Sequence, residues 1–216
     1  MKRLTGFIML AAICVLAGCS DVTPANRGVY MLMDTSGTYV NELKDAQKVI
    51  NVILVSMEPR DSFAVARIDT GSFSEKDIVA KVTFDDRPSM ANHQKRKFRQ
   101  GVDSFVKEVK PAAYTDITGG ILQAIEYLNE KGTGKKTILI FSDLKEDLRK
   151  GYVRDIPLQL TGFDVVAVNV TKLRSDNVDP REYLNRLEAW QQRVESGGGK
   201  WRVINDMDRL DRILDG

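Results

Sequence analysis

A short polar segment, Asp34-Thr35-Ser36-Gly37-Thr38, directly follows the apolar run Val29-Tyr30-Met31-Leu32-Met33. In an extended chain, residues two apart point the same way, so the side-chain oxygens of Asp34, Ser36 and Thr38 can converge on one point. A carboxylate with two hydroxyls is an all-oxygen ligand set, which suits hard cations such as Mg²⁺. The segment therefore predicts a cation site, with a simple cap on the following helix as the structural alternative.

Two later stretches carry similar oxygen-rich side chains where a strand ends or a helix begins. They are Thr115-Asp116-Ile117-Thr118-Gly119-Gly120 and Phe141-Ser142-Asp143. In an open α/β sheet, ligands gather beside the carboxyl ends of the strands, where loops from separate strands meet. Helix capping explains each stretch singly, whereas a shared cation site explains all three together. We therefore favour the cation site.

Strand and helix signals alternate along the rest of the chain. Five apolar runs are typical of strands buried on both faces of a parallel sheet, and they span residues 29–33, 63–68, 137–141, 163–170 and 201–204. Residues 78–84 instead alternate apolar and polar side chains, which predicts an edge strand antiparallel to its neighbour.

Between the strands, four segments place apolar residues on one helical face: 43–57, 98–109, 121–128 and 183–194. Strands that alternate with helices favour a parallel sheet covered on both faces. The predicted fold is α/β, a three-layer, doubly wound, mostly parallel six-stranded sheet with one antiparallel edge strand and helices on both faces.

The first twenty residues resemble a bacterial lipoprotein signal. Lys2 and Arg3 precede an apolar stretch of about ten residues, too short to span a bilayer, and Leu16-Ala17-Gly18-Cys19 follows. Resemblance to this lipobox implies removal of residues 1–18 and lipidation of Cys19. Residues 19–27 would then tether a domain formed by residues 28–216. An ordinary secretory signal or a buried N-terminal helix are the alternatives.

The lipobox also bears on location and chemistry. Ser20 after the lipidated cysteine implies, for a Gram-negative source, the periplasmic face of the outer membrane. Cys14 and Cys19 are the two cysteines, so a chain that begins at Cys19 has no thiol left for catalysis or for a disulfide. Without the signal, basic and acidic residues balance at 30 each, which gives no indication of a nucleic-acid partner.

Taken in order, the three polar stretches resemble the metal-ion-dependent adhesion site of von Willebrand factor A domains. The family motif Asp-x-Ser-x-Ser/Thr matches Asp34, Ser36 and Thr38, its separate threonine matches Thr115, and its late aspartate matches Asp143. The resemblance implies that the three hydroxyls bind Mg²⁺ (or Mn²⁺ or Ca²⁺), while the two carboxylates bind it directly or through water. An acidic side chain of a partner protein would complete the metal shell.

The resemblance implies a membrane-anchored protein of the cell envelope that mediates metal-dependent protein–protein interaction and is not an enzyme. One departure is visible, because many family members have Asp-Gly where this chain has Asp143-Leu144. Between Cys19 and the first strand lie about nine residues, which reach at most about 30 Å. We therefore expect the domain to sit near the membrane. If the strand at residues 29–33 runs away from the tether, as a first parallel strand would, the metal site at its carboxyl end points away from the bilayer.

Two alternatives remain open. A haloacid-dehalogenase-like phosphatase would use Asp34 as the nucleophile. Its usual second aspartate is replaced here by Ser36, whose hydroxyl titrates too far from neutral pH to transfer protons readily. A von Willebrand-like scaffold that binds partners without metal is the other alternative.

Overall fold

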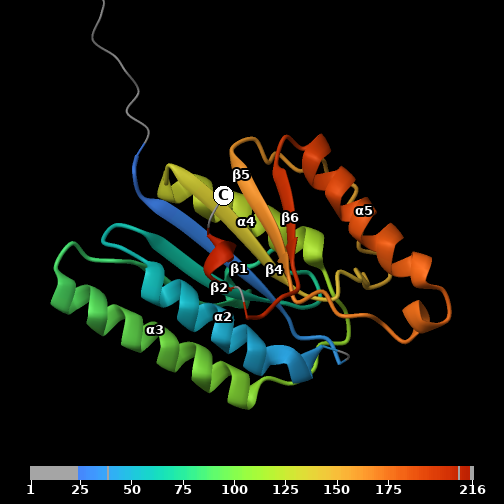
Figure 1. The fold of residues 1–216 in the computed structure, drawn as a ribbon, viewed down its shortest axis with the longest axis horizontal. Coiled ribbons are helices and arrows are strands. Elements are labelled where there is room, and N and C mark those ends of the chain that lie inside the picture. Colours follow the sequence, from blue (N-terminus) through green and yellow to red (C-terminus); the bar gives the residue numbers. More distant parts are fainter. Residues whose placement is uncertain (1–23, 38, 209, 215–216) are drawn as a thin grey trace, which may run out of the picture.

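The computed structural model describes residues 24–37, 39–208 and 210–214 (Figure 1). Cys19, the predicted signal and the first part of the predicted tether lie outside the described residues, as does Thr38. Within the described part, no helix combines the length and the apolar character needed to cross a bilayer.

Six strands form one sheet in the order β3-β2-β1-β4-β5-β6. Their bounds are β1 Arg27–Asp34, β2 Ser62–Ile68, β3 Ile78–Thr83, β4 Lys135–Phe141, β5 Phe163–Val168 and β6 Lys200–Ile204. All neighbours pair in parallel except β2 and β3, which pair antiparallel. The predicted strands and the antiparallel edge strand are therefore confirmed.

Helices cover both faces of this sheet, as predicted. The α-helices are α2 Leu43–Ser56, α3 Pro88–Glu108, α4 Ile117–Lys131 and α5 Pro180–Ser196, and the short 3-10 helices are η2 Val40–Glu42, η3 Glu75–Asp77, η4 Ser175–Asn177 and η5 Leu210–Ile213. In Figure 1, α2 and α3 lie in front of the sheet and α4 lies behind it. The side chains of α2 and α3 join one apolar cluster, and those of α4 and α5 join the other.

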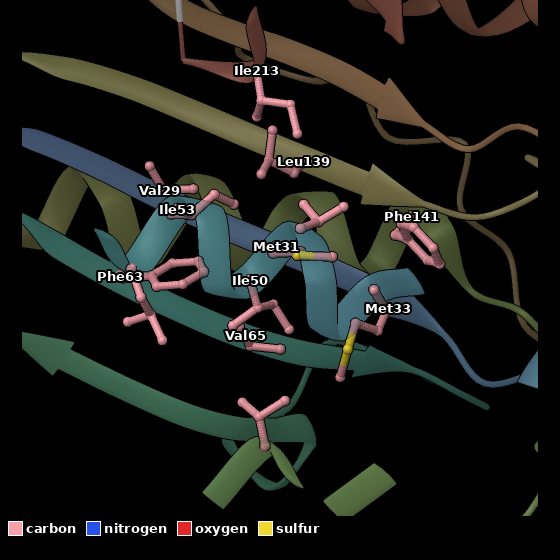
Figure 2. Close-up of a cluster of buried hydrophobic side chains, with 14 of the residues drawn as sticks. Val29, Met31, Met33, Ile50, Ile53, Phe63, Val65, Leu139, Phe141 and Ile213 are labelled. Atoms are coloured by element: carbon pink, nitrogen blue, oxygen red, sulfur yellow. The ribbon is translucent and has the colours of Figure 1, made fainter. Parts of the chain in front are cut away.

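Strand β1 carries side chains into both clusters. Val29, Met31 and Met33 point toward α2, where Ile50 and Ile53 meet them (Figure 2). Tyr30 and Leu32 point to the opposite face, among the side chains of α4 and α5. All five β1 side chains are buried. The strand is thus fixed from both faces, which also fixes the position of Asp34 at its carboxyl end.

Two of the differences from the predicted boundaries have a clear physical cause. Strand β5 ends at Val168 rather than at residue 170, because Asn169 takes a left-handed backbone conformation (φ 54°) that ends the strand. Helix α3 begins at Pro88, ten residues before the predicted apolar face. The first half of α3 is largely exposed, so its polar sequence carries little apolar periodicity.

Candidate metal centre

Three loops meet at the carboxyl ends of β1 and β4. We call them loop A (residues 34–37 and 39), loop B (residues 109–116) and loop C (residues 142–147). Loops A and B are joined directly, because the Ala112 N–H donates to the Thr35 carbonyl at 2.8 Å. The chain therefore brings segments about 75 residues apart into contact beside the end of the central strand.

Loops B and C are joined by a short antiparallel bridge between Thr115 and Asp147. The Thr115 N–H donates to the Asp147 carbonyl at 2.8 Å, and the Asp147 N–H donates back to the Thr115 carbonyl at 2.9 Å. Loops A, B and C together are called the three-loop edge below. The arrangement matches the sequence prediction that the three polar stretches share one edge of the sheet.

The side chains of Asp34, Thr35 and Ser36 alternate in direction. Thr35 turns toward the neighbouring strand, where its hydroxyl donates to the Ile68 carbonyl at 2.8 Å. Ser36 lies beside Asp34, because its N–H donates to Asp34 Oδ1 at 2.8 Å and its side chain also hydrogen-bonds to that carboxylate. Asp34 and Ser36 therefore lie together, away from Thr35.

Asp34 is fully buried at the centre of this edge. Its Oδ2 accepts a hydrogen bond of 2.6 Å from the Ser142 hydroxyl of loop C. Burial raises the pKa of the Asp34 carboxyl, and the hydrogen bonds from Ser142 and Ser36 oppose that rise by favouring the charged form. The site thus holds a carboxylate whose charge is poorly solvated, a condition that a bound cation relieves.

Asp143 supplies a second buried carboxylate, from loop C. Its Oδ1 accepts from the Lys145 N–H at 2.9 Å, and its backbone carbonyl accepts from Arg186 Nε at 2.8 Å. Burial raises the pKa of Asp143, and the nearby charge of Asp34 raises it further. The two carboxylates therefore repel each other across the edge.

Leu144 shows how the chain accommodates the departure from Asp-Gly. Its φ is +64°, in the left-handed region that glycine adopts readily and that costs other residues roughly 1–2 kcal/mol. Its side chain is buried, its N–H donates to the Ser142 hydroxyl at 3.0 Å, and its carbonyl accepts from Trp190 Nε1 at 3.0 Å. Burying a leucine side chain contributes about 1.5–3 kcal/mol, enough to offset that strain.

A surface cavity of about 360 Å³ opens over the three-loop edge. Its lining residues are Ser36, Gly37, Ala112, Ala113, Thr115, Asp143, Lys145, Asp147 and Leu173. Ser36, Thr115 and Asp143, one predicted ligand from each loop, therefore face the same space. The fourth described ligand, Asp34, hydrogen-bonds to Ser36.

The donor set fits a hard cation. It combines hydroxyls from Ser36 and Thr115 with the carboxylates of Asp34 and Asp143, and oxygen is the ligand atom that Mg²⁺ prefers. Among the described residues, no group of three or more His, Cys, Asp or Glu side chains is placed to hold a metal. This centre has two carboxylates and draws its remaining donors from hydroxyls.

The helix-capping alternative is wrong for the two aspartates. The N-cap of η2 is Tyr39, which makes no side-chain capping bond, and the Asp34 carboxylate bonds to Ser36 and Ser142 instead. No helix begins after Asp143, whose described neighbours form an irregular loop.

Two residues at this edge were not among the predicted ligands. Ser142 anchors Asp34, and Asp147 lines the cavity with an exposed carboxylate. Both belong to the run from Phe141 to Asp147, in which Asp143 alone was predicted to bind the metal. Their roles depend on side-chain direction in an irregular loop, where no periodic pattern indicates which residues face the site.

Comparison with known proteins places the fold. No family model matches the chain, and no curated protein matches it. Among solved structures, the pilus adhesin SpaC from Lactobacillus rhamnosus GG is 13% identical with a TM-score of 0.56, over 91% of this chain and 30% of that one. A von Willebrand factor type A structure from Catenulispora acidiphila is 16% identical with a TM-score of 0.52, over 87% of this chain and 40% of that one.

This chain thus spans less than half the length of either of these two structures. The likeness extends over nearly all of the described sheet and its helices, although few residues are identical. It agrees with the strand order and with the single antiparallel strand. The chain therefore has the fold of a von Willebrand factor A domain.

Proposed function

We propose that the protein docks a partner protein through a divalent cation held at the three-loop edge. The observation that carries this proposal is the convergence of Ser36, Thr115 and Asp143, from three separate loops, on one surface cavity. Mg²⁺ is the cation best suited to this all-oxygen set, with Mn²⁺ or Ca²⁺ as substitutes.

Each residue has a distinct part in holding the cation. Ser36 and Thr115 would offer hydroxyls, and Thr38 completes this group by its motif position. Asp34 and Asp143 would balance the metal charge, directly or through water. The cation supplies a positive contact for an acidic side chain of the partner. The cavity is open at the surface, so such a side chain can reach it.

We propose no catalytic step at this edge. A phosphatase built around Asp34 needs a second acid or base two residues on, and that position holds Ser36. Ser36 instead hydrogen-bonds to Asp34, which holds the carboxylate in place. These contacts favour a fixed docking surface over a reactive nucleophile.

The proposal includes a membrane anchor at Cys19 and a place in the cell envelope, on the periplasmic face of the outer membrane in a Gram-negative source. Strand β1 supports the predicted direction of the site. Arg27 begins the strand and Asp34 ends it, so about 25 Å of strand separates the tether end from the three-loop edge. A tether attached at Arg27 leaves the opposite edge facing away from the lipid.

Affinity capture tests the proposal. Membranes that carry the tagged full chain are solubilised, and partners are captured with Mg²⁺ and again with a chelator. We expect partners that are lost with the chelator and lost in Thr115→Ala. The control is Thr161→Ala, which removes an exposed threonine just before β5, at the opposite end of the sheet.

Two outcomes would contradict parts of the proposal. Partners that stay bound in the chelator and in Thr115→Ala would indicate a scaffold of the same fold that binds without metal. Equal membrane association of the wild type and Cys19→Ser would contradict the lipid anchor.

A further inference from the structure

A second cavity, of about 220 Å³, lies between α4 and the connection from β2 to β3. Its lining residues are Phe73, Ser74, Glu75, Gln123, Glu126, Tyr127 and Glu130, and we call it the α4 pocket. We propose that the α4 pocket binds an organic cation, an alkylammonium or guanidinium group on a short aliphatic stem. This site is separate from the three-loop edge and does not depend on its metal.

One face of α4 forms the first wall of the pocket. Gln123, Glu126, Tyr127 and Glu130 follow the spacing i, i+3, i+4 and i+7, which places them in one row along the helix. The facing wall is the segment from Phe73 to Glu75, at the start of η3. Tyr127 is buried and Phe73 is 51% exposed, so the pocket combines an aromatic floor with an aromatic rim.

The rim of the pocket is acidic. Glu75, Glu126 and Glu130 are all exposed. Lys81 pairs with Glu75 at 2.6 Å, and Lys131 pairs with Glu130 at 3.2 Å. No ion pair to Glu126 is found within the described residues, so three carboxylates face two ammonium groups and one negative charge is left over.

A buried amide points independently to a ligand. Gln123 is only 6% exposed and lines the pocket, yet its Oε1 has no hydrogen-bond partner within the described part of the chain. Leaving a buried acceptor unsatisfied costs about 1–3 kcal/mol. An N–H donor that enters the pocket would satisfy this oxygen, and both ammonium and guanidinium groups are such donors.

The walls select an organic cation over a bare metal ion. No three carboxylates among the described residues are placed to hold a metal together, so the three glutamates of the rim are too dispersed for one. The volume is several times the roughly 30 Å³ of one water molecule. Aromatic faces attract cations, and the Lys131 ammonium already lies 5.3 Å from the centroid of the Tyr127 ring.

An NMR titration of the purified protein tests this inference. The probes are n-butylammonium and the blocked amino acids N-acetyl-lysine and N-acetyl-arginine methylamide, with N-acetyl-norleucine methylamide as the neutral control. The readouts are the side-chain amide of Gln123 and the backbone amide of Glu75. We expect saturable shifts with the three cations, weakened by added salt, and no saturable shift with the norleucine compound.

Variants of exposed residues give the matched comparison. Glu126→Gln should weaken binding about threefold, the factor expected for one partly exposed ion pair, and Glu126→Lys should abolish it. Glu188→Gln changes an exposed glutamate on α5 and should leave binding unchanged. Because these positions are exposed, the variants should fold.

Comparison of the probes also separates two sources of such a cation, a protein side chain and a free amine. Tighter binding of the blocked amino acids than of n-butylammonium would assign the pocket to a lysine or arginine side chain of a protein, and equal binding would assign it to a free amine. Three results would overturn the inference: the norleucine compound binding as well as the cations, Glu126→Lys binding as well as the wild type, or shifts produced by Mg²⁺ alone.

Discussion

Ser142 connects the two carboxylate-bearing loops of the candidate metal centre. It is fully buried at the end of β4, donates to Asp34 Oδ2 at 2.6 Å, and accepts from the Leu144 N–H at 3.0 Å. This hydroxyl therefore positions the Asp34 carboxylate. It also accepts a hydrogen bond from the N–H of Leu144, the residue with strained backbone that follows Asp143. In the proposed metal centre, Ser142 would therefore support the predicted ligand Asp34.

Replacing Ser142 with alanine should affect both stability and metal binding. Loss of a hydrogen bond to a buried carboxylate costs about 1.5–3 kcal/mol, and the Leu144 N–H loses its acceptor. Urea denaturation measures the first effect, and the Mg²⁺-induced rise in Tm measures the second. Ser142→Thr keeps the hydroxyl and is the control that should restore the metal response. An unchanged metal response in Ser142→Ala would contradict the positioning role.

Asp143 offers a test that separates binding from folding. It is buried close to the charge of Asp34, and both carboxyl pKa values are raised by burial. Asp143→Asn removes one charge and keeps an oxygen for the Lys145 N–H. In a chelator, the Tm of this variant should therefore exceed that of the wild type. The variant should also lose its response to Mg²⁺.

The response of the wild type to Mg²⁺ gives the size of the effect that Asp143→Asn should lose. At ten times Kd, Mg²⁺ should stabilise it by about 1.4 kcal/mol, a rise in Tm of roughly 3–6 °C. Thermal denaturation, once with a chelator and once with Mg²⁺, measures the Tm of the metal-free protein and the rise in Tm that Mg²⁺ causes. A lower Tm for Asp143→Asn in the chelator would show that Asp143 stabilises the metal-free fold.

At the scale of elements, α4 must pack closely on β1 to keep loops A and B together. Gly120 makes this approach possible, because a Cβ at that position would lie 2.8 Å from Leu32 Cδ2, and Leu32 is fully buried. Gly120→Ala should lower the free energy of unfolding by about 1–3 kcal/mol through overpacking.

Gly101 of α3 is the matched control for Gly120. A Cβ there has no atom within 4 Å, so Gly101→Ala should stabilise the protein by about 1 kcal/mol through helix propensity. Urea denaturation of both variants measures the difference. Equal effects at the two positions would contradict the close packing of α4 on β1.

Helix α5 is tied to loop C through Arg186. Its guanidinium donates to the Asp143 carbonyl at 2.8 Å and to both oxygens of the buried Asp176 carboxylate at 2.8 and 3.1 Å. These hydrogen bonds from Arg186 lower the pKa of Asp176. The unfolded chain therefore binds the proton more tightly, so this pair contributes stability above about pH 4 that is lost as the pH falls through the folded-state pKa.

Asp176→Asn should therefore destabilise the protein in a pH-dependent way. The loss should be about 1–3 kcal/mol at pH 7 and should shrink as the pH falls below about 4. Urea denaturation from pH 3 to pH 7 measures it, with the exposed Asp155→Asn as the control. A destabilisation that does not change with pH would rule out the charged pair as its cause.

The elements were largely predictable because their signals are local. The continuous apolar run of β1 predicts a strand buried on both faces, and the alternation from Ile78 onward predicts the edge strand. The start of α5 is also encoded locally, because the carboxylate of its N-cap Asp179 accepts from the Arg181 N–H at 3.0 Å.

The irregular loops were less predictable for a physical reason. Asp34, Ser36, Thr115 and Asp143 were recognised from their motif, but the contact of Ser142 with Asp34 joins residues 108 apart in sequence. No local pattern encodes such a contact. The same holds for the α4 pocket, whose two walls come from segments about 50 residues apart.

At the scale of the whole molecule, the parallel strands share one direction, which gives the described sheet two distinct ends. Strand β1 runs from Arg27, the last residue of the predicted tether, to Asp34 at the three-loop edge. The parallel strands β2, β4, β5 and β6 run in the same direction, so their carboxyl ends gather at that edge. This single orientation is the one that the proposed membrane anchor at one end and the proposed metal-dependent docking surface at the other require.

Paramagnetic broadening by Mn²⁺ tests the central claim most directly. Substoichiometric Mn²⁺ is added to the isotope-labelled protein, and the amide signals that lose intensity are mapped by NMR. We expect the amides of Ser36, Thr115 and Lys145 to broaden first, and the double variant Ser36→Ala/Thr115→Ala to lose this effect. Broadening centred elsewhere, or unchanged in the double variant, would contradict a divalent cation site at the three-loop edge.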